Sequence, residues 1–172
     1  MQSRKFSCKI NLTKNLTNQQ VKDICSLKNK HWKFGFKSQI EWFKLNSFAN
    51  DLHYQIYNKK KLIGYLHLGN RSFKKLNIKG DYILFRNLII DKNYRSSGLS
   101  KQIMKFANTY IKSKKKIGFL ICKRKLLTYY LKNEWSFKYK KNYTLRDHKH
   151  NKMIFMFYNL RYKGRLKFYY KV

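Results

Sequence analysis

Residues 81–107 read DYILFRNLIIDKNYRSSGLSKQIMKFA, and this stretch decides the fold. Its first ten residues form the longest apolar run of the chain, typical of a central strand buried on both faces in its second half. After a polar turn at 91–98, apolar residues recur at helical spacing from Leu99 to Ile111. The pattern predicts a strand over 81–90, a turn, and a helix over 97–112.

The turn places small residues at 96–100 between two cations, Arg95 and Lys101. The start of a helix has unpaired N–H groups and a partial positive charge, and Gly98 can adopt a positive φ without strain. Such a turn can bind phosphate or pyrophosphate. The residues alone equally allow an ordinary strand-to-helix connection with Ser97 as the helix cap. A Walker loop and a dinucleotide fingerprint are both excluded, because only one glycine is present.

The N-terminal half predicts a strand, two helices and a hairpin. Phe6 to Leu12 alternate between apolar and polar residues. Thr17 to Gln20 and Ser38 to Glu41 have the pattern of a capping box, so each should begin a helix. Two strand signals, 53–57 and 62–68, flank a short turn and predict a hairpin. Residues 70–80 are predicted to be a polar connection.

The C-terminal half predicts a strand at 117–122, a helix at 126–133, and strands at 135–139 and 153–160. Strand 81–90, helix 97–112 and strand 117–122 form a right-handed βαβ crossover, so these two strands should be parallel neighbours. The remaining strand pairs are expected to be antiparallel. The tail at 161–172 is basic and aromatic without clear periodicity.

With its flanking residues, the turn resembles motif A of the GNAT acyltransferase superfamily. That motif is a strand ending in apolar residues, a short polar turn, and [RQ]-x-x-G-x-[GA] at the start of a helix. Arg95 and Gly98 match it, whereas Ser100 replaces the last small residue. A second match lies downstream, where Tyr129 and Tyr130 end a helix before Trp135. Two departures occur there: Glu134 stands where the family has Gly, and Lys123 where it often has Asn.

The resemblance implies a single GNAT-like α/β (α+β) domain over residues 1–160, followed by the tail 161–172. Its sheet would be mixed and mostly antiparallel, with a splayed parallel pair, and flanked by helices. Acetyl-CoA would be the acyl donor, without a metal. The residues implied to bind it are Leu88, Ile89, Ile90, Arg95, Ser96, Ser97, Gly98, Leu99, Ser100 and Lys101.

Tyr130 matches the position of the usual general acid of the family, which protonates the leaving thiolate. A phenol with a pKa of about 10 can donate that proton at neutral pH. The general base is not identified, because the middle of strand 81–90 is apolar where the family often has a Glu. Five residues could act through water: His31, Asp51, His53, His67 and Asp81. His148 and His150 are interpreted as solvated residues rather than metal ligands.

The chain carries 41 Lys and Arg against 7 Asp and Glu, a net charge of +34. Codon drift in an AT-rich genome explains this bias, since Pro is absent and Lys, Asn and Ile abound. A functional field for polyanions is the other explanation. Three separated cysteines without CxxC spacing indicate a reducing, cytoplasmic location. We expect no signal peptide and no transmembrane segment.

The predicted function is transfer of an acetyl group to a primary amine of a small molecule. The positive field favours phosphate-bearing acceptors, such as nucleotide-linked amino sugars, over polyamines. Weak, nonspecific polyanion binding is expected besides, and the oligomeric state is not predicted. Two other functions stay open: a nucleic-acid- or ribosome-binding protein, and a membrane-surface enzyme that uses the basic tail.

Overall fold

The computed structural model describes residues 6–75, 78–137, 143–146, 153–160 and 166–169. The chain forms two compact units, residues 1–69 with 86–105 and residues 70–85 with 106–172. Strands β3 (Lys61–Lys75) and β4 (Ile78–Ile90) and helix α3 (Leu99–Ser113) contribute to both units. Each unit is described by itself below.

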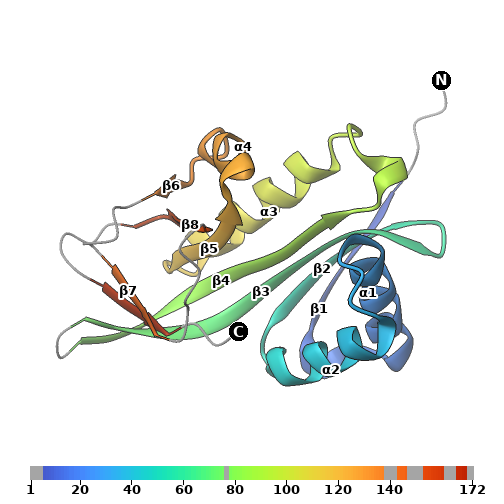
Figure 1. The fold of residues 1–172 in the computed structure, drawn as a ribbon, viewed down its shortest axis with the longest axis horizontal. Coiled ribbons are helices and arrows are strands. Elements are labelled where there is room, and N and C mark those ends of the chain that lie inside the picture. Colours follow the sequence, from blue (N-terminus) through green and yellow to red (C-terminus); the bar gives the residue numbers. More distant parts are fainter. Residues whose placement is uncertain (1–5, 76–77, 138–142, 147–152, 161–165, 170–172) are drawn as a thin grey trace. The chain divides into compact units, whose positions relative to one another are not determined.

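The strands are hydrogen-bonded in the order β1-β2-β3-β4-β5-β8-β6, with β9 paired to β3 and β7 (Figure 1). The remaining strands are β1 (Ser7–Leu12), β2 (Leu52–Asn58), β5 (Ile117–Lys123), β6 (Ser136–Phe137), β7 (Tyr143–Arg146), β8 (Met153–Tyr158) and β9 (Leu166–Tyr169). β4 and β5 are parallel, as the crossover predicted. β7 and β9 are also parallel, so the expectation that all other pairs are antiparallel is wrong. The mixed sheet with flanking helices confirms the predicted fold class.

In the first unit, helices α1 (Asn18–His31) and α2 (Phe36–Asn46) lie beside β1 and β2 (Figure 1). Their apolar faces pack into one core with residues of β2, β3 and β4. Ile24 and Tyr65 are fully buried there. Burying one such side chain stabilises the fold by about 1.5–3 kcal/mol.

The two predicted capping boxes have different outcomes. Thr17 accepts a hydrogen bond from the Gln20 backbone, and the Gln20 side chain accepts one from the Thr17 N–H, so the first box is confirmed. The second prediction is wrong, because Ser38 lies inside α2. That helix begins after Gly35, whose φ is +89° and whose N–H donates to the Asn29 side chain. A glycine turn and a neighbouring helix set this start.

The predicted polar connection at 70–80 is also wrong. β3 continues to Lys75 and β4 begins at Ile78, so most of the segment is extended strand. Pairing of β3 with β9 supports it, since Phe73 lies opposite Phe168. The burial along β4 also differs from the prediction, which placed the buried residues in the second half of the strand. Residues 82–85 in the first half are buried, whereas Leu88 and Ile90 are half-buried.

In the second unit, aromatic residues of β4, β5 and β8 form the core, including Tyr82, Phe119 and Phe157. Gly118 lies close to Ile111 of α3, and a Cβ there would be 2.9 Å from its Cδ1. The predicted helix at 126–133 is shorter and begins with a 3₁₀ turn, η3 (Arg124–Leu126), before α4 (Leu127–Leu131). Of the predicted strand at 135–139, Ser136 and Phe137 form β6, Trp135 precedes it, and residues 138–139 lie outside the described residues.

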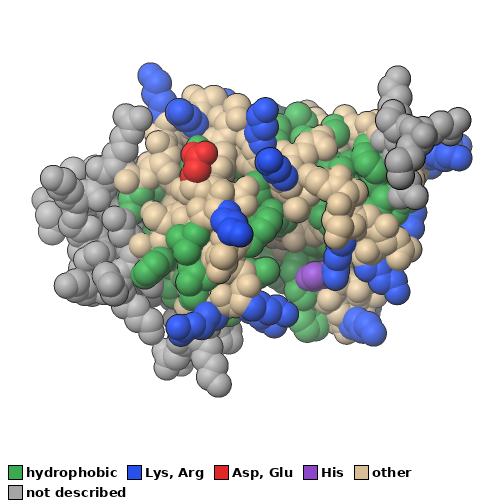
Figure 2. Space-filling model, turned by 90° about the horizontal axis from the view of Figure 1, so that it is seen from above, with side chains coloured by type: hydrophobic (Ala, Val, Ile, Leu, Met, Phe, Trp, Pro, Cys, Tyr) green, Lys and Arg blue, Asp and Glu red, His purple; other side chains and the backbone are tan. Residues whose placement is uncertain are grey.

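Lys and Arg side chains are scattered over the face seen in Figure 2 rather than gathered in one patch. Among the described residues, no helix combines the length and apolar character needed to cross a membrane.

Candidate functional site

Strand β4 contains a left-handed residue near its end. Asn87 has a φ of +59°, which interrupts regular strand geometry as a β-bulge does. The parallel pairing with β5 covers Tyr82↔Ile117 to Leu84↔Phe119, whereas β4 runs on to Ile90. The sequence reasoning did not single out Asn87. The available signal was an Asn within an apolar strand, because Asn tolerates this conformation better than most residues.

The strand end is held by Asp91, which is 7% exposed. Its N–H donates to the Ile63 carbonyl, and its carboxylate accepts from the Asn93 N–H. Lys30 and Lys61 lie 3.9 Å and 3.6 Å from the same carboxylate. These contacts fix the start of the 3₁₀ turn η2 (Lys92–Tyr94), which leads into the predicted phosphate-binding turn.

The turn itself adopts two positive φ angles, +65° at Ser96 and +80° at Gly98. A Cβ added to Gly98 would meet no atom within 4 Å, so the space beside it is open. Arg95, Ser96, Ser97 and Gly98 are exposed. An open, positive-φ glycine allows a ligand to approach the backbone closely.

Helix α3 begins directly after this glycine. The Gly98 carbonyl accepts the first helical hydrogen bond, from Gln102 N–H. Ser97 is not the cap that the alternative interpretation required, because its hydroxyl donates to the Tyr94 carbonyl at 2.5 Å. Glycine in the cap position has no side chain to accept from the first-turn N–H groups.

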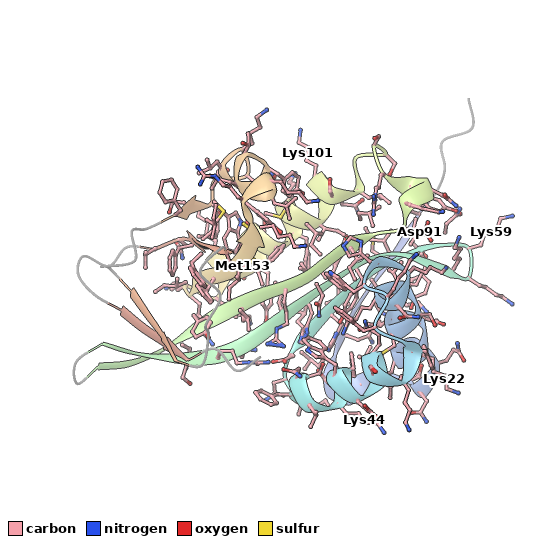
Figure 3. The ribbon with its side chains drawn as sticks, in the orientation of Figure 1. Lys22, Lys44, Lys59, Asp91, Lys101 and Met153 are labelled. Atoms are coloured by element: carbon pink, nitrogen blue, oxygen red, sulfur yellow. The ribbon has the colours of Figure 1, made fainter. Side chains whose placement is uncertain are left out.

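The other predicted donor-site residues divide by burial. Ile89 and Leu99 are buried, at 2% and 3% exposure, and belong to the packing of the first unit. Ser100 is half-buried, and Lys101 is exposed on α3 (Figure 3). The first unit therefore brings together the strand end, the turn and the helix start.

Tyr130 lies on α4 in the second unit and is 7% exposed. Its ring packs edge-on against Phe85 and Trp135, with centroids 6.0 Å and 6.3 Å away. Burial raises the pKa of the phenol, and the neighbouring Cys122 and Tyr129 raise it further. The Tyr130 hydroxyl therefore keeps its proton at neutral pH and is available as a proton donor.

Glu134, which stands where the family has glycine, has a φ of +69°. This left-handed conformation is the one that glycine adopts without steric cost. The backbone geometry of the motif is therefore kept despite the substitution.

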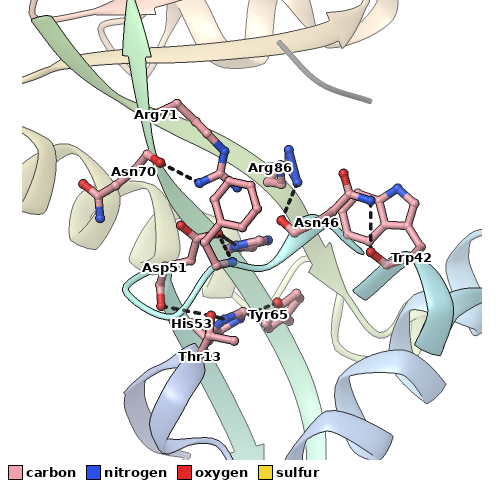
Figure 4. A network of polar contacts seen from close by, with 11 residues as sticks. Thr13, Trp42, Asn46, Asp51, His53, Tyr65, Asn70, Arg71 and Arg86 are labelled. Carbon is pink, nitrogen blue, oxygen red and sulfur yellow. Dashed lines mark hydrogen bonds and ion pairs between the residues drawn. The ribbon is translucent and has the colours of Figure 1, made fainter. Parts of the chain in front are cut away.

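Three of the five candidate bases come together in the first unit. His53 and His67 are directly paired across β2 and β3, and their rings stack with centroids 4.7 Å apart. His67 Nε2 lies 3.0 Å from Asp51 Oδ2. Figure 4 shows Asp51 and His53 in this buried network. The sequence named these residues separately and did not predict the cluster.

His53 completes the network through two hydroxyl groups. Its ring nitrogens lie 2.7 Å from Thr13 Oγ1 and 2.7 Å from the Tyr65 hydroxyl. Burial lowers the pKa of His53 to about 3, and the neighbouring His67 lowers it further while Asp51 opposes the shift. His53 is thus neutral at neutral pH. At 0–1% exposure, the two histidines and Asp51 tie β2 to β3 rather than meet a substrate directly.

The other two candidate bases lie elsewhere. His31 is exposed at the end of α1 and packs edge-on against Trp32. Asp81 is exposed and forms an ion pair with Lys116 at 3.4 Å. His148 and His150 lie outside the described residues. Within the described part of the chain, no three or more His, Cys, Asp or Glu residues form a group that could hold a metal ion.

No protein-family model matches the sequence, and no curated protein does. Solved structures match the fold over almost the whole chain. An acyl-CoA N-acyltransferase from Pseudomonas aeruginosa shares 14% identity with a TM-score of 0.67, covering 90% of this chain and 99% of its own. The GNAT family N-acetyltransferase YhbS from Escherichia coli, solved with CoA, shares 11% identity with a TM-score of 0.67. The match covers 98% of this chain and 93% of the YhbS chain.

An aminoglycoside 6'-N-acetyltransferase complexed with coenzyme A shares 10% identity with a TM-score of 0.62, covering 91% of this chain and 99% of its own. At such identities the likeness is one of fold. The chain therefore has the fold of the GNAT acyltransferases, as the two sequence motifs predicted.

Proposed function

We propose that this protein is an acetyl-CoA-dependent N-acetyltransferase that acetylates a primary amine of a small molecule. The observation that carries the proposal is Gly98, an open, positive-φ glycine directly before a 15-residue helix at the end of β4. Residues 1–160 would carry the activity. The segment 161–172, expected to be a tail, contributes strand β9 to the sheet through pairing with β3 and β7. The three cysteines are free, which supports a cytoplasmic location.

The donor's diphosphate would lie on the backbone N–H groups of residues 96–101. Glycine at 98 leaves room for phosphate oxygens, and the start of α3 adds its partial positive charge. Arg95 and Lys101 are exposed beside the turn and supply two full charges. No buried side chain needs to move for this contact.

The reaction would be direct transfer. The amine nitrogen attacks the thioester carbonyl carbon, the C–S bond breaks, and the amine's proton passes to water. A backbone N–H from residues 88–90 would polarise the carbonyl. The N–H of Asp91 is not available for this, because it donates to the Ile63 carbonyl at 2.8 Å. Tyr130 would protonate the thiolate.

The experiment compares two glycines with the same geometry. Gly35 has a φ of +89° and open space around its Cβ position, as Gly98 has, and it precedes α2. We expect Gly98→Asp to weaken acetyl-CoA binding more than about tenfold in isothermal titration calorimetry, because a carboxylate would meet the phosphate. Gly35→Asp carries the same backbone strain and should bind as the wild type does.

The wild type, the two glycine variants and a separate Tyr130→Phe variant are then assayed for release of CoA thiol with a panel of primary amines. Tyr130→Phe should bind acetyl-CoA normally and release thiol more slowly. Equal acetyl-CoA binding by the Gly98→Asp and Gly35→Asp variants would reject the donor site.

A further inference from the structure

Helix α1 buries a cation that has no hydrogen-bond partner among the described residues. Lys28 is 2% exposed, and its Nζ lies 3.6 Å from the centre of the Trp42 ring. The indole face attracts the ammonium group, but it does not accept its three N–H bonds. Lysine is almost never fully buried without an ionic partner, because the loss of hydration is costly.

A second cation shares the same ring. The Arg86 guanidinium carbon lies 5.2 Å from the Trp42 centroid, and Arg86 donates to the Asn46 carbonyl at 3.1 Å. The Asn46 side chain in turn donates to the Trp42 carbonyl at 3.0 Å. Figure 4 shows this chain of contacts. The guanidinium is therefore held beside the indole by the end of α2.

No neighbouring group of Lys28 balances this charge. Burial lowers the pKa of Lys28 to about 8; Cys25 opposes that shift, and the nearby Arg86 adds to it. The thiol of Cys25 stays neutral, because burial raises its pKa to about 11. The carboxylate of Asp51 is engaged elsewhere, because its Oδ2 accepts hydrogen bonds from His67 and from the Phe48 N–H. Lys28 makes no ion pair within the described part of the chain.

Two members of the cluster are partly exposed to solvent. Trp42 and Arg86 are half-buried, so an anion could reach them from outside, with Lys28 behind. Arg86 directly precedes the left-handed Asn87, whose side-chain amide nitrogen is also buried without a hydrogen-bond partner. Ile90 lies four residues after Arg86 on the same strand. Strand β4 therefore carries both Arg86 and the proposed thioester contact.

We propose that Lys28 and Arg86, which both lie against the ring of Trp42, bind an anionic group, a carboxylate or a phosphate, carried by the amine acceptor. This inference rests on the proposed acetyl transfer. Arg86 would engage two oxygens with its planar fork, and Lys28 would act as the point charge. The acceptor class is then an amino acid or an amino-sugar phosphate rather than a polyamine.

The test uses the full chain without acetyl-CoA, so that it does not depend on the donor site. Binding is followed by tryptophan fluorescence with two matched pairs of probes: glucosamine 6-phosphate against glucosamine, and glycine against glycinamide. Lys28→Met and Arg86→Gln are the test variants. Lys22→Met is the control, because Lys22 is exposed on the same helix and its loss changes the net charge equally (Figure 3).

In the wild type and in Lys22→Met, at least one anionic probe should bind more than about tenfold more tightly than its neutral partner. The pair that shows the difference identifies phosphate or carboxylate. Lys28→Met and Arg86→Gln should each lose this preference for the anionic probe. Equal binding within both pairs, or unchanged discrimination in Lys28→Met, would overturn the anion site. Discrimination without any acetyl-CoA binding would overturn the proposed transfer and leave the anion site standing.

Discussion

At the scale of single residues, three positions of interest have a left-handed backbone. Gly98 has a φ of +80° before α3, Glu134 has +69° before Trp135, and Asn87 has +59° in β4. Glycine is the clearest sequence signal for this conformation, and asparagine is a weaker one. Glu134 adopts it in spite of its side chain, so the surrounding chain imposes it.

His53 makes stability dependent on pH. The unfolded chain protonates this residue near its ordinary pKa of 6.5, whereas the folded protein does so only near 3. Protonation between these values favours the unfolded state, so the free energy of unfolding should fall as pH falls through this window. The contribution is at most about 1.4 kcal/mol per pH unit.

The measurement is urea unfolding from pH 7 to pH 4 for the wild type and His53→Gln. Glutamine keeps a donor and an acceptor but does not titrate, so its slope should be shallower. Identical slopes would show that His53 is not the titrating group.

At the scale of elements, two similar sequence patterns give a matched pair of variants. Thr17→Ala removes the side chain that caps α1 and should lower the free energy of unfolding by about 1 kcal/mol. Ser38→Ala lies inside α2 and removes no cap, so it should be neutral or slightly stabilising. Thermal unfolding by circular dichroism measures both. A larger loss in Ser38→Ala than in Thr17→Ala would contradict the observed start of α2.

At the scale of the whole molecule, the net charge is +34, and the Lys and Arg side chains in view in Figure 2 are scattered over that face. Dispersed positive charge can bind polyanions without a specific binding site, because the contacts release counterions from the polyanion. We expect affinity for single-stranded RNA to fall more than about tenfold between about 50 and 200 mM salt, since several phosphate contacts are lost together. Filter binding across this range measures it.

Binding of acetyl-CoA should decrease less over the same range, because the donor has far fewer phosphates and also meets the α3 turn. RNA binding that resists salt, combined with no acetyl-CoA binding, would favour the nucleic-acid function over acetyl transfer.

The sequence by itself determined the order of most elements, the parallel pair of β4 and β5, the capped start of α1 and the turn at Gly98. These features depend on periodicity and on residues a few positions apart. Only the tertiary structure decided which distant side chains meet. The hairpin turn alone would pair His53 with Leu66, but an irregularity between Ile56 and Tyr57 shifts the register by one residue.

That shift sets His53 opposite His67 and places their rings on the same face of the sheet, because a slip of one residue turns every side chain over. Lys28, Trp42 and Arg86 likewise come from α1, α2 and β4, and only packing brings them together. Local patterns therefore specified the turn at Gly98, whereas register and packing created the buried histidine network and the cation pair.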